Sequence, residues 1–448
     1  MTSFLEKIFH LRSHGSTVGR EVIAGITTFA AMAYILAVNP EILANAGMPE
    51  GALVTATAVG AAIATLLMAA LTNFPIALAP GMGINAFFAF TICGAMGVPW
   101  QSALGLVFVN GCIFLLLSVT GIREKIIDGI PHSLKVAVTA GIGFFIAFIG
   151  LQNGGFVVKN PDTMVSMGEL SSPGVALFFC GLLLMAALIT RRVPGAIIIG
   201  VFAIMIAGVF VPDGKGGHIT QWPASIVSAP APIEPTLFKL NFNLFTADPM
   251  RAVALTLTLL IVDMFDNIGS LIGVTRRAGL MGPDDKIPNA GRALVADSSA
   301  AIFSSLLGTS TVVTYIESAT GVQAGGRTGL TATVTALCFL AALVFTPLFL
   351  AVPAVAVAPA LVMVGVFMFE AVTDLDARDM VDFAPAVLTI LMMPLAFSIS
   401  TGMGVGILAL VVLALVTGRW ERLHPVILVL AAVFLLYFME NPLLAALK

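Results

Sequence analysis

The sequence predicts an all-α polytopic membrane protein, from its composition, its apolar stretches and its distribution of positive charge. Of the 448 residues, 59% are hydrophobic and 10% are charged, and the mean hydropathy is +1.05. Soluble domains carry about 25% charged residues, so this chain has too few charges to cover a surface that faces water. The composition excludes a soluble enzyme, a disordered scaffold and a nucleic-acid-binding protein, and it makes the lipid bilayer the expected surroundings.

The apolar stretches are long enough to cross a bilayer, which requires about 20 residues in a helix. Seven candidate spans precede a long polar loop, at 22–40, 51–72, 74–94, 100–121, 132–152, 173–190 and 195–211. Seven more follow that loop, at 252–275, 291–307, 309–322, 329–350, 354–372, 384–400 and 403–418. A last apolar stretch, 424–439, fits either an extra span or an interfacial helix.

The positions of Lys and Arg test this count of fourteen and set the orientation. With the N-terminus in the cytoplasm, 16 of the 21 basic residues fall inside, four fall outside, and Lys448 is unassigned. Cytoplasmic loops are enriched in Lys and Arg, so this asymmetry supports both the count and a cytoplasmic N-terminus. The expected parts are a cytoplasmic segment 1–20, a seven-span unit 21–211, an outer loop 212–250, a second seven-span unit 251–418 and a C-terminal segment 419–448.

Because each unit has an odd number of spans, the two units are expected in opposite orientations. Weak internal similarity agrees with a repeat. A shift of 232 residues places Tyr34 on Asp266 and Asn85 on Glu317, and a shift of 222 places Gly143 on Gly365. The sequence therefore predicts two inverted repeats of seven spans.

Two of the spans are interrupted at corresponding places in the two units. Residues 74–94 contain Pro and Gly before Asn85, and residues 308–318 are rich in Gly and β-branched residues. Such residues suit extended backbone better than helix. Extended backbone at membrane depth must be buried in protein or line a cavity, and paired interruptions of this kind indicate the binding site of a transporter.

Three acidic residues, Asp263, Asp266 and Glu317, lie inside predicted spans rather than in loops. Asp263 and Asp266 are three residues apart and so face one side of a helix. A charge at the bilayer centre costs at least about 2.5–3.5 kcal/mol on insertion scales, and no basic residue shares these apolar stretches. A functional role is expected, either binding a proton or accepting hydrogen bonds from a polar substrate. A structural polar contact between spans is the alternative.

Two other residue types carry less information. Phe87 and Phe88 follow Asn85, and either ring could stack on a planar ligand, although most Phe side chains in spans serve packing. The four cysteines all lie in apolar stretches, in a spacing that fits neither a disulfide framework nor a zinc site.

Several of these stretches resemble the nucleobase–cation symporter family, in its AzgA-like purine permease branch. The resemblance extends from about Leu11 to Arg422. The matching stretches are residues 79–88, 265–274, 308–310, 315–318 and 325–330, the last reading Gly-Gly-Arg-Thr-Gly-Leu. Ser270 stands where uracil and xanthine relatives carry a His, which favours the purine branch.

The resemblance implies fourteen spans in two inverted repeats, divided into a core domain and a gate domain. The third and tenth spans each hold a short strand and a half-helix, with the substrate between them. In relatives, two acids at the positions of Asp266 and Glu317 hold the base, and an aromatic at the position of Phe87 or Phe88 stacks on it. The candidate substrate-binding residues are Asn85, Phe87, Phe88, Asp263, Asp266, Thr314, Ile316 and Glu317.

The expected function is import of adenine, hypoxanthine or guanine by a secondary transporter of the inner membrane, with alternating access between core and gate. Purines present N–H donors, and carboxylates are strong acceptors. Because the base is uncharged, uphill uptake needs a coupled ion. The expected ion is H⁺, carried by Asp263, Asp266 or Glu317, with Na⁺ as the alternative. No cofactor, metal or nucleic-acid partner is expected, and the sequence does not decide whether the protein forms a homodimer.

Two other functions are weighed against this one. An anion transporter of the same fold would need basic residues or free helix N-termini around the anion, and the three buried acids disfavour it. An intramembrane Asp-dependent enzyme is the other alternative. A prenyl-transferring enzyme would place its acids with Mg²⁺ near basic residues, and an aspartyl protease would carry Gly-x-Gly-Asp, which is absent.

Overall fold

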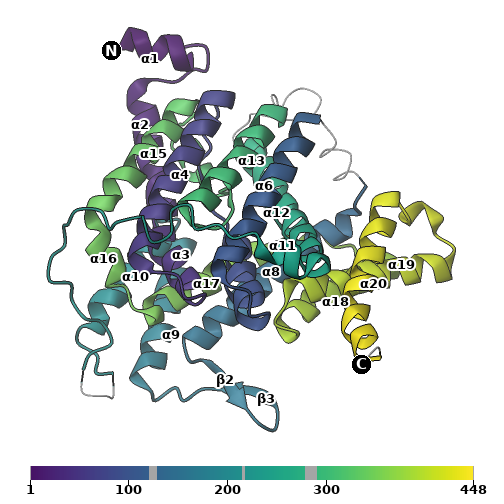
Figure 1. Ribbon diagram of the computed structural model, residues 1–448. Coiled ribbons are helices and arrows are strands. Elements are labelled where there is room, and N and C mark those ends of the chain that lie inside the picture. Colours follow the sequence, from purple (N-terminus) through teal and green to yellow (C-terminus); the bar gives the residue numbers. More distant parts are fainter. Residues whose placement is uncertain (1, 121–128, 214–216, 278–289, 447–448) are drawn as a thin grey trace.

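The computed structural model describes residues 2–120, 129–213, 217–277 and 290–446. Within these ranges, helices account for most of the chain (Figure 1). Eight of them are long and apolar enough to cross a membrane: Val18–Ala44, Glu50–Thr72, Trp100–Thr120, His132–Asn153, Pro173–Thr190, Gly329–Leu350, Ala354–Asp374 and Ile399–Thr417. Shorter apolar helices occupy Met82–Ala95, Ala196–Gly208, Met380–Leu395 and Pro425–Leu436.

The elements up to the outer loop are α1 (Thr2–Phe9), α2 (Val18–Met32), α3 (Ile35–Ala44), α4 (Glu50–Thr72), β1 (Leu78–Pro80), α5 (Met82–Ala86), the π-helix η1 (Phe87–Ala95), α6 (Trp100–Thr120), α8 (His132–Asn153), β2 (Val157–Asn160), β3 (Met164–Met167), α9 (Pro173–Thr190) and α10 (Ala196–Gly208). The later elements are α11 (Asn243–Ala247), α12 (Pro249–Arg277), α13 (Ala290–Leu307), β4 (Val312–Thr314), α14 (Ser318–Gln323), α15 (Gly329–Ala342), α16 (Thr346–Leu350), α17 (Ala354–Phe369), α18 (Met380–Leu395), α19 (Ile399–Thr417) and α20 (Pro425–Ala446).

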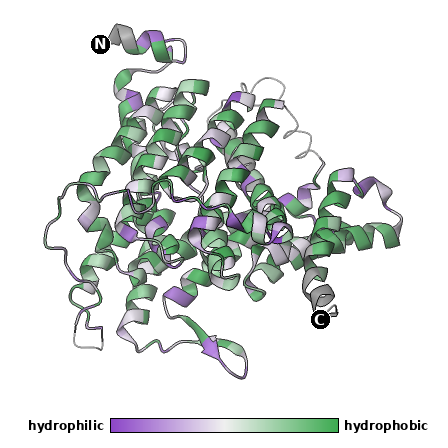
Figure 2. Cartoon of the chain, in the orientation of Figure 1, coloured by the Kyte–Doolittle hydropathy of each residue, from purple (hydrophilic) through white to green (hydrophobic). Residues whose placement is uncertain are grey.

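Helices from distant parts of the sequence lie side by side. In Figure 1, α15 stands beside α2 and α4, and α13 stands beside α6. Helices α18, α19 and α20 form a separate group at the right, which α8 and α12 join to the rest. The apolar stretch at 424–439 therefore belongs to a helix, α20, that packs against α19 and α12. Figure 2 shows that hydrophobic residues dominate the helices, as the composition requires.

Two short buried strands pair inside the helical body. Strand β1 pairs antiparallel with β4, with Leu78 opposite Thr314 and Pro80 opposite Val312. Side chains also bond to the backbone at the start of β1, at Leu78 and at Ala77 just before it. Thr65 Oγ1 accepts from the Leu78 N–H at 2.9 Å, and Ser318 Oγ accepts from the Ala77 N–H at 3.0 Å. These contacts supply the hydrogen bonds that non-helical backbone lacks when it lies away from water.

Helices α8 and α17 approach each other closely because both carry Gly at the crossing. A Cβ added to Gly143 would lie 2.6 Å from the carbonyl oxygen of Gly365, and one added to Gly365 would lie 2.7 Å from the Cβ of Ala147. Small residues allow this backbone-to-backbone contact, which is a common basis of helix association in membranes. The contact fixes the position of α17, which forms one wall of a cleft beside the two strands.

Candidate functional site

A cleft that holds about 450 Å³ of space, part of it open to solvent, lies beside the paired strands β1 and β4. Its lining comes from four places in the chain. Tyr34 lies in the break between α2 and α3, Gly81 and Met82 follow β1, residues 313–317 belong to β4 and the turn after it, and Val364, Phe367 and Met368 belong to α17.

Glu317 is the acidic residue that lines this cleft. The Tyr34 hydroxyl donates a hydrogen bond of 2.7 Å to Glu317 Oε1. The Tyr34 side chain is only 1% exposed, whereas Glu317 is half-buried. Glu317 directly precedes the half-helix α14, and its carbonyl accepts from Thr320 Oγ1 at 2.7 Å. A carboxylate is thus held, with one oxygen engaged by a phenol, at the edge of a largely apolar space.

Tyr34 is absent from the residues expected on sequence grounds. It is one of only three Tyr in the chain, and it lies in the middle of an apolar stretch. The available signal was a polar aromatic ring inside an apolar stretch, at the position that the internal repeat aligns with Asp266. The break between Met32 and Ile35 turns this ring toward the cleft, and hydropathy alone does not reveal such a break.

Thr314 and Ile316 also line the cleft, as members of the segment that ends in Glu317. Thr314 is buried and pairs with Leu78 across the two strands. Ile316 is 40% exposed, next to the carboxylate. The segment therefore presents an apolar side chain, a hydroxyl-bearing residue and an acid to the same space.

Asn85 lies in a buried network of hydrogen bonds rather than in the lining of the cleft. Its Nδ2 donates to Asn39 Oδ1 at 2.6 Å, and its Oδ1 accepts from the Ser310 hydroxyl. Asn39 Nδ2 in turn donates to Thr57 Oγ1 at 2.6 Å and Thr309 Oγ1 at 3.1 Å. The network joins α3, α4 and α5 to the residues before β4, so it fixes the relative position of the two interrupted stretches.

Phe87 and Phe88 are both fully buried at the start of η1, and neither lines the cleft. The aromatic side chains that line it are Tyr34, Tyr315 and Phe367. Tyr315 is held by its hydroxyl, which donates to the Pro80 carbonyl at 2.6 Å.

The structure describes the side chain of only one of the two acids of α12. Asp263 is 1% exposed, and its Oδ2 accepts from Asn110 Nδ2 of α6 at 3.0 Å, away from the cleft lining. Asp266 lies three residues further along the same helix, but its side chain is outside the part of the chain that the structure describes. The structure therefore brings together Glu317, Ile316 and Thr314, and it places Asp263 in a contact between α12 and α6.

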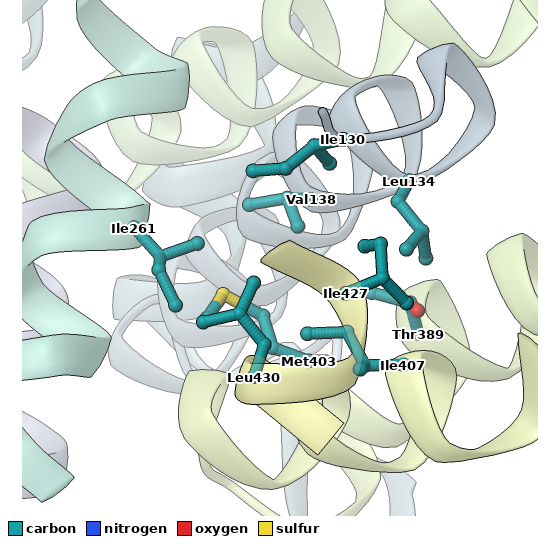
Figure 3. Close-up of a pocket in the computed structure, with 9 residues that line it drawn as sticks. All are labelled: Ile130, Leu134, Val138, Ile261, Thr389, Met403, Ile407, Ile427 and Leu430. Atoms are coloured by element: carbon teal, nitrogen blue, oxygen red, sulfur yellow. The ribbon is translucent and has the colours of Figure 1, made fainter. Parts of the chain in front are cut away.

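A second space lies where α8 and α12 meet α18, α19 and α20 (Figure 3). All of its lining side chains are aliphatic except Met403 and Thr389. It offers no charged group to a polar ligand, so the cleft at Glu317 is the better candidate site. Among the described residues, no group of three or more His, Cys, Asp or Glu side chains could hold a metal ion.

Comparisons with known proteins agree with this architecture. Residues 19–405 match the model of the family described as the permease family. The adenine permease AdeP of Escherichia coli K12 is 40% identical over 96% of this chain and 95% of its own length. The guanine/hypoxanthine permease PbuG of Bacillus subtilis 168 is 41% identical over 97% of this chain and 99% of its own length.

Among solved structures, the transmembrane domain of the cyanobacterium bicarbonate transporter BicA has a TM-score of 0.61 and 16% identity, covering 83% of this chain and 96% of that one. At that identity the likeness is one of fold, and it confirms the prediction of a mostly helical polytopic membrane protein. The family model and the relatives at about 40% identity cover nearly the full length. This chain therefore belongs to the permease family, and it is a membrane transport protein rather than an enzyme.

Proposed function

We propose that the protein imports purine nucleobases and that the base binds in the cleft at Glu317. The observation that carries this proposal is the Glu317 carboxylate, held by Tyr34 at the edge of an otherwise mainly apolar space. A purine is planar and presents N–H donors at its edge, which a carboxylate accepts strongly. The names of the relatives, adenine permease and guanine/hypoxanthine permease, support the same substrate class.

In this arrangement Glu317 Oε1 is engaged by Tyr34, which leaves Oε2 to accept from the base. The side chains of Met82 and Phe367 provide apolar surface for the ring faces. Asp266 is proposed as the second acid of the site, and Asn85 and Asp263 as residues that support it. Stacking on Phe87 or Phe88 would require the cleft to open toward η1 during transport, because both rings are covered in this structure.

Thermal stabilisation of the purified protein tests the proposal. Adenine, hypoxanthine or guanine is expected to raise the Tm, because a ligand that binds only the folded state stabilises it. Uracil and bicarbonate, at the same concentrations, serve as controls. Stabilisation by bicarbonate alone would favour the anion transporter, and stabilisation by uracil alone would place the protein with pyrimidine carriers.

We also propose fourteen spans in two inverted repeats, with core and gate domains that alternate the access of the site. Two contacts support an approximate two-fold relation. Gly143 and Gly365, which the internal similarity aligns, touch each other between α8 and α17. Strands β1 and β4, from the two interrupted stretches, pair antiparallel with Ala79 opposite Val313. Elements that meet their own counterparts in opposite directions are what a two-fold axis in the membrane plane produces.

The proposed orientation places the N-terminus in the cytoplasm and the protein in the inner membrane. In a background without the four native cysteines, Ile226→Cys in the outer loop is expected to react with a membrane-impermeant maleimide in intact cells. Ala377→Cys, between α17 and α18, should react only after the cells are permeabilised. Both side chains are exposed, so accessibility within the protein does not limit either reaction. The reverse labelling pattern would invert the orientation.

Proton coupling is the last part of the proposal. An uncharged base needs a coupled ion for uphill uptake, and an acid without a neighbouring cation in its span is a suitable proton carrier. Adenine uptake is therefore expected to collapse with a protonophore and to continue when Na⁺ is replaced by choline. Uptake that survives the protonophore but stops without Na⁺ would assign the coupling to Na⁺.

A further inference from the structure

The Gly-Gly-Arg-Thr-Gly-Leu stretch, residues 325–330, lies outside the cleft and joins α14 to α15. It is bound by Glu21, a fully buried acid in the first turn of α2. Glu21 Oε1 accepts from the Arg327 N–H at 3.0 Å, and Oε2 accepts from the Thr331 hydroxyl at 2.5 Å and its N–H at 3.2 Å. The Thr328 N–H donates to Oε2 at 3.3 Å. One carboxylate thus satisfies several free N–H groups at the start of α15.

The side chain of Arg327 carries this attachment on to α14. Its Nη1 donates to the carbonyls of Val322 and Gly326, at 2.8 Å each, where the half-helix ends. A half-helix of six residues makes few hydrogen bonds of its own, so contacts at its two ends decide where it lies. Glu317 is the residue that immediately precedes it.

Residues 18–34, which comprise α2 and the break after it, contact α14 and the residues on either side of it at three levels. Glu21 holds the end of α14 through the 325–330 stretch. In the middle, Gly321 packs against α2 so closely that an added Cβ would lie 2.7 Å from the Ala24 carbonyl oxygen. At the far end, Tyr34 donates to Glu317. Glu21 lies in the first turn of α2 and Tyr34 lies two residues past its end, so α2 runs beside the whole half-helix.

We propose that Glu21 is a positioning residue of the transport site. By fastening the 325–330 stretch to α2, it sets the place of α14 and so holds the Glu317 carboxylate opposite Tyr34. This inference rests on the proposed function, because Glu317 is the proposed ligand of the base. Glu21 itself lies outside the lining of the cleft and acts only through α14.

Another attachment keeps the 325–330 stretch in place when Glu21 is substituted. Asn73 Oδ1 accepts from the Gly329 N–H at 2.9 Å, and Asn73 Nδ2 donates to the Phe9 carbonyl at 2.9 Å. The start of α15 therefore remains tied to α4, and the loss is confined to the side that faces α2. Glu21→Gln keeps the side-chain volume, and Thr331→Val is a milder change that removes a single donor hydroxyl.

The matched control is Asp379→Asn, which likewise replaces a helix-capping acid by its amide. Asp379 Oδ1 accepts from the Val381 N–H at 3.1 Å at the start of α18, and its Oδ2 forms ion pairs with Arg419 and Arg422 that the substitution removes. Helix α18 contributes no side chain to the cleft. Binding of adenine to the purified proteins, the KM of uptake and the Tm are measured for all three variants. Glu21→Gln is expected to weaken binding and raise KM about tenfold, and Thr331→Val less. Asp379→Asn should lower the Tm and leave KM as in wild type.

A second readout does not depend on the substrate. In the cysteine-free background, Ile316→Cys places a thiol in the cleft beside Glu317, and its alkylation rate reports the position of this segment. Glu21→Gln is expected to change that rate by about threefold or more, because α14 loses its attachment to α2. Asp379→Asn should leave the rate unchanged. An unchanged rate in Glu21→Gln would overturn the proposal, whether or not wild type binds purines.

A lower Tm of Glu21→Gln with a wild-type KM would also overturn the proposal, since it would make Glu21 a residue of stability alone. Failure of wild type to bind any purine would instead refute the proposed function, and the alkylation rates would still decide the role of Glu21.

Discussion

Glu317→Gln is expected to bind adenine at least about tenfold more weakly than wild type. The substitution keeps the side-chain volume but replaces a charged acceptor by an amide, one end of which is a donor. That donor end would face either the Tyr34 hydroxyl or an N–H of the base, each of which is itself a donor. An unsatisfied buried polar group costs about 1–3 kcal/mol, and about 1.4 kcal/mol is a factor of ten in affinity. Calorimetric titration of the purified variant measures the effect directly.

Three companion variants separate the roles of the neighbouring groups. Asp266→Asn should weaken binding as much as Glu317→Gln, because both acids are proposed to accept from the base. Tyr34→Phe should have a smaller effect, since it removes one hydrogen bond to the carboxylate but keeps both the acid and the ring. Asp263→Asn should impair uptake more than binding, because Asp263 contacts Asn110 rather than the cleft. Wild-type affinity in both Glu317→Gln and Asp266→Asn would show that the base binds elsewhere.

Hydropathy was sufficient to predict the helical membrane fold, because a spanning segment must satisfy its own backbone and face lipid with apolar side chains. The same constraint made the interrupted stretches visible. Pro, Gly and β-branched residues inside an apolar run disfavour a helix, so a stretch rich in them indicates extended backbone. Strands β1 and β4 lie in those two stretches. The position of Glu317 at a cleft was predictable on the same ground, since an acid there has to face a polar partner or a cavity.

The orientation of individual side chains was less accessible to sequence reasoning. Tyr34 reaches Glu317 because the chain breaks after α2, and such a break leaves no mark in the apolar pattern. The family resemblance predicts Asn85 as a substrate-binding residue, yet in this structure its amide is engaged by Asn39 and Ser310. Glu21 meets its partners about 306 residues away in sequence, so only the fold reveals why Arg327 and its neighbours matter.

The second large effect is expected at the crossing of α8 and α17. Gly365→Val should prevent the accumulation of folded protein, and Gly365→Ala should lower stability by about 1–3 kcal/mol, the usual cost of overpacking. An added Cβ would meet the Cβ of Ala147 at 2.7 Å and its backbone nitrogen at 2.8 Å, and backbone atoms cannot turn aside as a flexible side chain does. The monodisperse yield after purification and the Tm in detergent measure both effects.

Gly174, in the first turn of α9, is the matched control, because nothing lies within 4 Å of a Cβ placed there. Gly174→Val and Gly174→Ala should therefore give wild-type yield and Tm.

Substitutions at the two sites also differ in their effect on the cleft. Val364 and Phe367, on either side of Gly365, line the cleft, so a displaced α17 moves the wall opposite Glu317. Folded Gly365→Ala should then bind adenine more weakly than Gly174→Ala does. Equal stability and equal affinity in the two Ala variants would mean that α8 and α17 separate easily and that their contact does not shape the site.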